Sequence, residues 1–292
     1  MVVPDQDEAG VRHAEWVIST LKGKASSVKV VNPSAGKDLA EWISLGATIP
    51  MIETAAVDAF EMDEALPVKP QRPAFQFLDV GELIKDIKPI QWLVRDYFER
   101  DAISLIYGPP ACGKSFFAID IVCSVAMGRE WMGHKTHSGS VFYIAGEGHN
   151  GLARRFKAWE VGRDTKIEMG RIFKSAGALS ILDENEVQAM VEAIEVNIEQ
   201  TGEVPAIVVV DTLARNFGAG DENSTEDMSK FIDHIDRNIR KRWMCNVLIV
   251  HHSGHNAERA RGSSALKAAV DSEIEVTKDE NGNVKIKATK MK

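Results

Sequence analysis

The loop from Gly108 to Ser115 carries the clearest chemistry in the sequence, because GPPACGKS matches the phosphate-binding pattern G-x-x-x-x-G-K-[ST] at every fixed position. Its glycines let backbone N–H groups point at a phosphate, Lys114 adds a positive charge, and Ser115 offers a hydroxyl to Mg²⁺. The apolar run 102–107 predicts a strand before the loop, and the apolar-rich segment 115–128 predicts a helix after it. We therefore expect a nucleoside triphosphate with Mg²⁺ to contact nine consecutive residues: Gly108, Pro109, Pro110, Ala111, Cys112, Gly113, Lys114, Ser115 and Phe116.

A second strand predicts the metal-binding carboxylate. The β-branched run 206–210 ends in Asp211, and in a parallel sheet this end of the strand lies beside the loop. Asp211 and Ser115 are therefore the expected Mg²⁺ ligands, and a solvated aspartate after an ordinary core strand is the alternative. The sequence contains no N-K-x-D guanine motif, which favours ATP over GTP.

A third apolar run, 141–145, leads into Gly146, Glu147 and Gly148. A carboxylate at this edge can accept a proton from water held in line with the γ-phosphate, so Glu147 is the candidate general base. A solvated acid in a turn is the alternative.

A fourth run, 246–250, ends in His251 and His252, either of which could sense the γ-phosphate. A histidine pair without a role is an equally good interpretation. Zinc binding with His255 and Cys245 is disfavoured, because adjacent strand residues point to opposite faces and no C-x-x-C or H-E-x-x-H pattern completes a site.

Farther on, Arg259 and Arg261 lie among small residues. From such a loop an arginine can reach the phosphates bound by a neighbouring subunit, which would make hydrolysis depend on assembly. A solvated basic loop is nearly as good an interpretation.

These runs predict an α/β fold with a mainly parallel sheet flanked by helices. Apolar residues from Met228 to Ile239 recur at helical spacing, and alternating apolar residues around Asn281-Gly282 predict a C-terminal β-hairpin. At 292 residues and 44% hydrophobic content, the chain can bury an ATPase core and a small N-terminal βα appendage. We place the core domain at 76–292, after a proline-containing linker at 48–75 with a short acidic helix around Glu53 to Leu66.

The appendage at 1–47 has a chemistry of its own. Asp5 and Asp7 follow a short strand and could share Mg²⁺, before a helix to about Lys22 and a strand at 28–31. This order resembles the second half of a Toprim domain, the metal-binding fold of bacterial and phage primases, with a small βα cap on the ATPase as the alternative. Toprim domains need an earlier strand ending in a catalytic glutamate, so we expect a partial segment without primase activity and a natural protein that is longer at its N-terminus.

The larger domain resembles the RecA-like ATPases and, more closely, the RepA-type hexameric replicative helicases of plasmids and phages. The resemblance rests on the loop Gly108–Ser115, on YIAGEG at 143–148, on VDTLAR at 210–215, on VHH at 250–252 and on RGSS at 261–264. It implies ATP and Mg²⁺ binding by Lys114, Ser115 and Asp211, and water activation by Glu147. It also implies a sensor role for His252 (or His251), and a trans-acting arginine finger at Arg261.

Composition limits the partners. A net charge of −8 is opposite to the usual footprint of a nucleic-acid-binding protein, although a ring needs positive groups only on loops lining its channel, here 214–224 and 253–263. The resemblance implies weak, salt-sensitive binding to single-stranded DNA by a homo-oligomer, a hexameric ring. The alternative is a nucleotide-switched DNA-binding or loading ATPase without unwinding activity, and a recombinase is a distant third.

Three cysteines without paired spacing fit a reducing cytoplasm. The sequence shows neither an export signal nor an apolar run long enough to cross a membrane. We therefore expect a cytoplasmic protein without a membrane partner.

Overall fold

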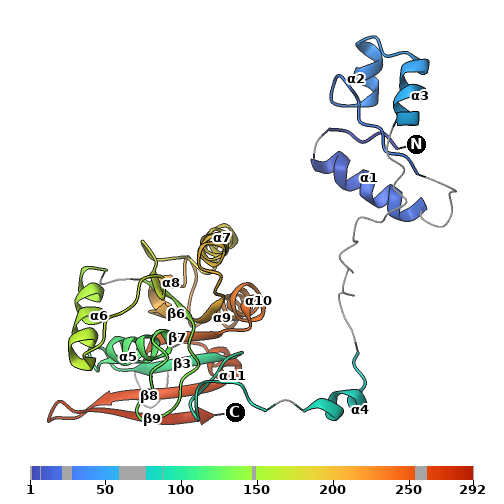
Figure 1. Ribbon diagram of the computed structural model, residues 1–292. Helices are drawn as coiled ribbons and strands as arrows, with labels where there is room; N and C mark the ends of the chain where they lie inside the picture. Colours follow the sequence, from blue (N-terminus) through green and yellow to red (C-terminus); the bar gives the residue numbers. More distant parts are fainter. Residues whose placement is uncertain are drawn as a thin grey trace. The chain divides into compact units, whose positions relative to one another are not determined.

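The computed structural model describes residues 2–6, 8–21, 28–58, 77–87, 89–146, 149–253 and 262–291. The chain divides into two compact units, Met1–Ile87 and Lys88–Lys292, drawn in Figure 1. The functional candidates of the ATPase all lie in the second unit.

The first unit is mainly helical in its described residues and contains one parallel bridge. Val2 pairs with Val30, and these two residues flank the predicted helix in the sequence. The strand predicted at 28–31 is therefore reduced to a single bridge. Asp5 is exposed, and Asp7 lies outside the described residues, so the shared Mg²⁺ site remains a prediction. The helices are α1 (Glu8–Leu21), α2 (Leu39–Ser44), α3 (Ile49–Asp58), α4 (Val80–Leu83) and the 3₁₀ turn η1 (Ile84–Asp86).

Two local details explain where these helices begin. Asp38 caps α2, because its side chain accepts the N–H of Glu41 at 2.7 Å, and Trp42 is buried behind it. Helix α3 begins earlier than the helix predicted around Glu53, because Pro50 is compatible with a first helical turn. Residues 59–76, where that predicted helix would continue, lie outside the described part of the chain.

The second unit is built on a seven-stranded sheet in the order β5-β4-β6-β7-β3-β8-β9. Strands β5 to β8 along this order are mutually parallel, and β9 pairs with β8 in antiparallel fashion as the predicted C-terminal hairpin. The strands are β3 (Ile103–Gly108), β4 (Ser140–Ala145), β5 (Ile172–Lys174), β6 (Pro205–Asp211), β7 (Asn246–His252), β8 (Ser272–Lys278) and β9 (Val284–Met291). A separate two-stranded ribbon consists of β1 (Trp92–Val94) and β2 (Phe98–Glu99).

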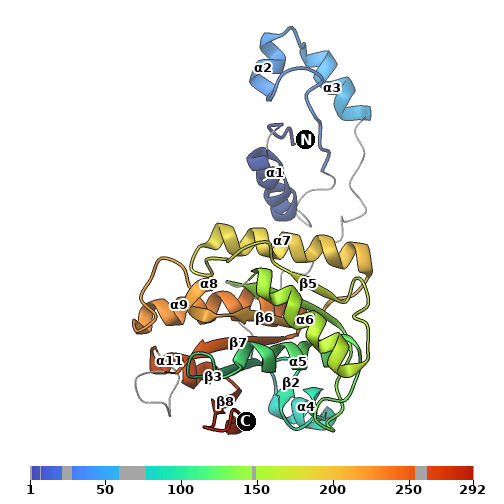
Figure 2. The same cartoon turned by 90° about the vertical axis from the view of Figure 1, so that its left-hand side faces the viewer.

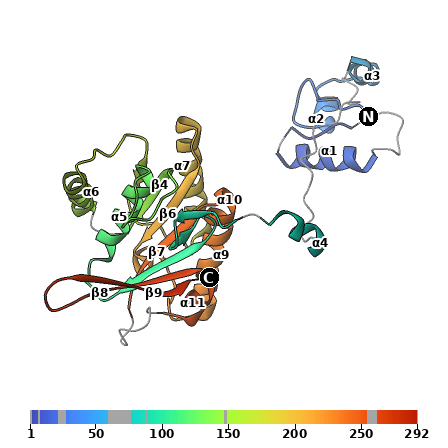
Figure 3. The same ribbon diagram turned by 60° about the horizontal axis from the view of Figure 1, so that its bottom comes forward.

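Helices cover both faces of this sheet, as Figure 3 shows. One face carries α5 (Lys114–Ala126) and α6 (His149–Arg163), and Figure 2 views the molecule from the side of α6. The other face carries α7 (Glu184–Thr201), α9 (Thr225–Ile235) and α11 (Ser264–Ala269), with α8 (Leu213–Asn216) after β6. Helix α9 continues through the π-helical segment η2 (Asp236–Arg240) into α10 (Lys241–Trp243), where the sequence predicted a helix.

Two apolar cores follow from strand alternation. Tyr143, Val209 and Val250 belong to the core beneath α5 and α6, whereas Val210 and Ile249 belong to the core beneath α7 and α9. Because the central strands are buried on both faces, they are continuously apolar, as expected for a parallel sheet. The predicted α/β fold class, with its parallel sheet, flanking helices and C-terminal hairpin, is therefore confirmed, and its architecture is RecA-like.

No helix among the described residues is long and apolar enough to cross a membrane.

Candidate functional site

The sheet order brings the predicted site residues to one edge. Strand β7 lies between β3 and β6, with Gly108 beside His252 in register and Asp211 beside Val250. Strand β4 pairs with the other side of β6 and places Ala145 beside Asp211. Since these strands are parallel, their carboxyl ends form one continuous edge, which is where α/β sheets bind ligands.

The phosphate-binding loop has the backbone that its sequence requires. Ala111 and Gly113 adopt positive φ angles of 59° and 103°, and α5 starts directly after them at Lys114. Gly108 is needed for a different reason: a Cβ at this position would lie 2.0 Å from the carbonyl oxygen of Val276 on β8. The loop is thus shaped both by its own turns and by the neighbouring strand.

Lys114 is held inside the loop. Its ammonium Nζ donates to the carbonyl oxygens of Gly108 at 2.9 Å and Pro109 at 2.7 Å, and the side chain is 5% exposed. Burial lowers the pKa of Lys114, and the nearby Cys112 and Asp211 oppose this shift. A buried cation directed into a phosphate-binding loop is suited to a phosphate oxygen.

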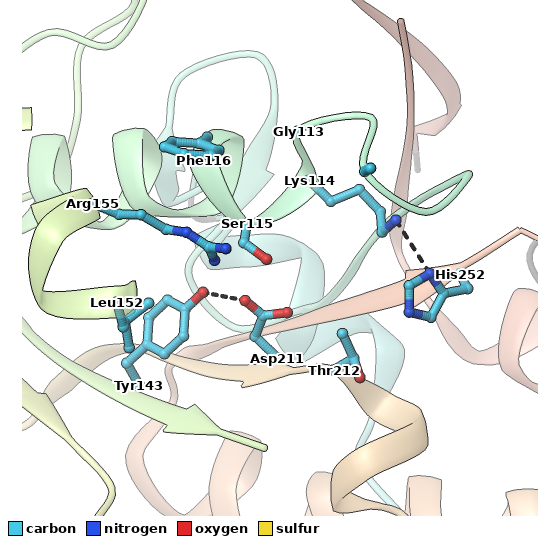
Figure 4. Close-up of a pocket in the computed structure, with 11 residues that line it drawn as sticks. Gly113, Lys114, Ser115, Phe116, Tyr143, Leu152, Arg155, Asp211, Thr212 and His252 are labelled. Atoms are coloured by element: carbon cyan, nitrogen blue, oxygen red, sulfur yellow. Dashed lines mark hydrogen bonds between the residues drawn. The ribbon is translucent and has the colours of Figure 1, made fainter. Parts of the chain in front are cut away.

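A cavity of about 470 Å³ opens at this edge (Figure 4). The sequence predicted seven of the residues that line it: Ala111, Gly113, Lys114, Ser115, Phe116, Asp211 and His252. Four lining residues were assigned no role from the sequence: Tyr143, Leu152, Arg155 and Thr212. Of the other loop residues, Cys112 is buried and Pro110 is exposed.

The oxygen ligands predicted for Mg²⁺ lie on the same cavity. Figure 4 shows the hydroxyl of Ser115 above the carboxylate of Asp211, and hard oxygen ligands of this kind suit Mg²⁺. The phenol of Tyr143 donates to Asp211 Oδ2 at 2.5 Å. Burial and the Asp211 carboxylate raise the pKa of Tyr143 well above its ordinary value, so the phenol keeps its proton and remains a donor at neutral pH.

The two histidines lie on opposite faces of the sheet. His252 lines the cavity, and its Nδ1 is 3.4 Å from Lys114 Nζ. His251 is fully buried on the other face, with Nε2 3.8 Å from Glu222 Oε2. Of the two, only His252 is placed where it could sense a phosphate.

Arg155 brings a positive charge to the cavity from α6. Its guanidinium lies 5.1 Å from the ring centroid of Phe116, a side chain that is 58% exposed, and Figure 4 shows it pointing towards Ser115. Asp120 of α5 holds α6 in place, because it accepts the indole N–H of Trp159 at 2.9 Å and the guanidinium of Arg163 at 2.8 Å. No distinctive spacing distinguishes Arg155 from the other charged residues of α6 in the sequence.

Glu147 and Arg261 lie outside the described residues, so their predicted roles stay predictions. The residue before Glu147 is described: a Cβ on Gly146 would lie 2.3 Å from Cβ of Arg215. This close approach brings the end of β4 tightly against α8.

A hydrogen bond links the two candidate channel loops, 214–224 and 253–263. The N–H of Ser263 donates to the carbonyl oxygen of Glu222 at 2.9 Å, and the hydroxyls of Ser263 and Thr225 are 3.1 Å apart. One loop follows β6 and the other follows β7, so this contact links the segments after the Asp211 and His252 strands.

The basic residues of η2 and α10 are paired with carboxylates. Arg240 bonds to Asp236 and Asp101, and Arg237 pairs with Asp233 at 2.7 Å. Lys241 pairs with Asp236, and Arg242 pairs with Glu195. This cluster is therefore an ion-pair network rather than a free basic surface.

One protein family matches more than half of the chain. A family model named AAA_25 and described as "AAA domain" matches residues 69–258. A KaiC-like protein from the hyperthermophilic archaeon Pyrococcus horikoshii OT3 is similar in structure, with 15% sequence identity and a TM-score of 0.45, over 68% of this chain and 83% of that one. No curated protein matches the sequence.

Proposed function

Because the chain belongs to the AAA_25 family of AAA domains and is a P-loop ATPase, we propose that it is an ATP-driven DNA helicase that works as a homohexameric ring. The observation that carries the proposal is the convergence of Lys114, Ser115, Asp211 and His252 on one cavity at the carboxyl edge of a parallel sheet. This arrangement supports ATP hydrolysis, and the assignment to DNA rests on the resemblance to RepA-type helicases.

In the proposed hydrolysis, different residues of the chain have different roles. Lys114 and the backbone N–H groups of the loop bind the phosphates, and Ser115 and Asp211 are the residues that would hold Mg²⁺, which would supply positive charge to the phosphates. Glu147 accepts the proton of the attacking water, and His252, through its contact with Lys114, responds to loss of the γ-phosphate. Arg261 completes the site of the next subunit, so turnover requires assembly.

The loop contacts support a motor. His252 touches Lys114 at one end of β7, and the loop that follows β7 bonds at Ser263 to the loop that follows β6. His252 directly precedes one candidate channel loop, and the hydrogen bond from Ser263 to Glu222 links that loop to the other. We propose that single-stranded DNA is bound by these loops, with exposed Arg215 on the first of them.

Strand displacement tests this proposal. The full chain with ATP and Mg²⁺ is expected to unwind a forked DNA duplex, and single-stranded DNA at low salt is expected to stimulate its ATP turnover. A variant Arg215→Ala should lose stimulation while keeping basal turnover. Indifference of turnover to single-stranded DNA would contradict the helicase assignment and leave the ATPase assignment standing.

A second candidate is a nucleotide-switched DNA-loading ATPase without unwinding activity. The net charge of −8 and the ion-pair network around Arg240 both weaken DNA binding, which fits a protein that holds DNA only in its ATP-bound state and does not track along a strand. The two candidates separate by experiment: the loading protein would bind DNA in an ATP-dependent way and assemble with an ATP analogue, but would not displace a strand.

We also propose that residues 1–47 form a partial Toprim-like segment. The parallel bridge between Val2 and Val30 on either side of α1 supports a strand-helix-strand order. Manganese is expected to broaden NMR signals around Asp5, and the effect should vanish in Asp5→Ala; absence of broadening in the unsubstituted chain would contradict this assignment.

A further inference from the structure

Tyr143 makes one contact that the proposed mechanism does not use. Its hydroxyl donates to Asp211 Oδ2 at 2.5 Å, and both side chains are almost completely buried. The ring is fixed independently by Phe156 of α6, which packs against it edge-on with centroids 6.1 Å apart. The phenol is therefore held in place by packing and directed at a single carboxylate oxygen.

The strand register explains why a tyrosine is needed at this position. Tyr143 of β4 pairs with Val209 of β6, and Ala145 pairs with Asp211. Tyr143 and Asp211 thus lie on the same face as diagonal neighbours, a separation that long or aromatic side chains can span. Phenylalanine would keep the packing at this position and lose the hydrogen bond.

The contact leaves the two carboxylate oxygens of Asp211 in different surroundings. Figure 4 shows Oδ2 directed at the phenol, while the second oxygen lies on the side of the cavity below Ser115. A carboxylate rotates about its last bond, so a donor on one oxygen fixes the direction of the other. Without this donor, the carboxylate is free to turn towards the positive charge of Arg155, which lines the same cavity.

We propose that Tyr143 is a positioning residue for the magnesium site: it clamps one oxygen of Asp211 so that the other faces the Mg²⁺-bound nucleotide. This inference rests on the proposed ATP and Mg²⁺ site. Tyr143 touches neither the nucleotide nor the reacting water in this role; it acts through Asp211.

The test is the Mg²⁺ dependence of nucleotide binding, measured with a fluorescent ATP analogue and the full chain. In Tyr143→Phe, the Mg²⁺ concentration for half-maximal binding should rise on the order of tenfold, as for other residues that orient a metal ligand. Binding of the analogue in EDTA should stay the same. Tyr107→Phe, which removes the hydroxyl of a buried tyrosine on the opposite face, should leave the Mg²⁺ dependence unchanged.

A double-mutant cycle separates positioning from general damage to the fold. In an Asp211→Ala background, Tyr143→Phe should have no further effect on the Mg²⁺ dependence, because its only route of action is gone. An unchanged Mg²⁺ dependence in a folded Tyr143→Phe, or an equal shift in both backgrounds, would overturn the inference. Absence of Mg²⁺-dependent binding by the unsubstituted chain would instead contradict the proposed function itself.

Discussion

The end of β7 places one histidine on each face of the sheet, and the two faces surround these histidines differently. On the face of α5 and α6, His252 lies beside Lys114 and Asp211 bonds to Tyr143, around a cavity. On the face of α7 and α9, His251 is buried next to Glu222. One step along a strand therefore separates a side chain available to a ligand from one that belongs to the core, and substitutions on the two faces should have different kinds of effect.

The largest effect is expected for Lys114→Ala on the cavity face. Loss of the ammonium removes the charge that faces the phosphate, so ATP turnover should fall on the order of a hundredfold or more. The fold should survive, because burying the ammonium of Lys114 costs free energy, as its lowered pKa indicates. The variant removes this cost. Turnover assays and thermal unfolding check both halves of the prediction, and turnover close to the unsubstituted rate would refute the assignment of this cavity.

His252→Ala should have a smaller effect on the same face. It removes the ring beside Lys114, and we expect ATP turnover to fall about tenfold with little change in unfolding free energy. Steady-state turnover with and without single-stranded DNA measures the loss. If His251→Ala lowered turnover as much as His252→Ala does, the division between the faces would be wrong.

Arg155→Ala should raise the KM for ATP about three- to tenfold, because it removes a cavity charge and its contact with Phe116. Arg154 is the matched control, since it is the preceding residue of the same helix and is exposed. Initial-rate measurements over a range of ATP concentrations compare the two variants. Equal KM values for both would contradict a role of Arg155 in ATP binding.

His251→Ala should change stability rather than turnover. The substitution empties a buried position and removes the imidazole beside Glu222, which should cost about 2 kcal/mol of unfolding free energy. Urea denaturation measures this cost, and turnover per folded molecule should stay within about twofold of the unsubstituted rate. A stable variant with poor turnover would show that the buried face takes part in catalysis.

Much of the cavity face could be predicted from the sequence, since the loop pattern places Lys114 and Ser115 and the apolar strand places Asp211. Alternation along a strand also implied that His251 and His252 point to opposite faces. It could not say which of them faces the loop, because this depends on the register that pairs Gly108 with His252.

The other contacts depend on tertiary geometry that no local pattern contains. Tyr143 reaches Asp211 only because β4 and β6 are neighbours in a given register. Arg155 reaches the cavity because Asp120 binds two side chains of α6. In the first unit, a predicted strand became a single bridge, as short runs with few partners are weakly specified by sequence.

The most direct test of the account is calorimetric titration of the full chain with a slowly hydrolysed ATP analogue in the presence of Mg²⁺. We predict one nucleotide bound per chain, and binding weakened on the order of a hundredfold in Lys114→Ala. Absence of binding to the folded, unsubstituted chain, or equal binding by the Lys114→Ala variant, would contradict the claim that this cavity binds ATP.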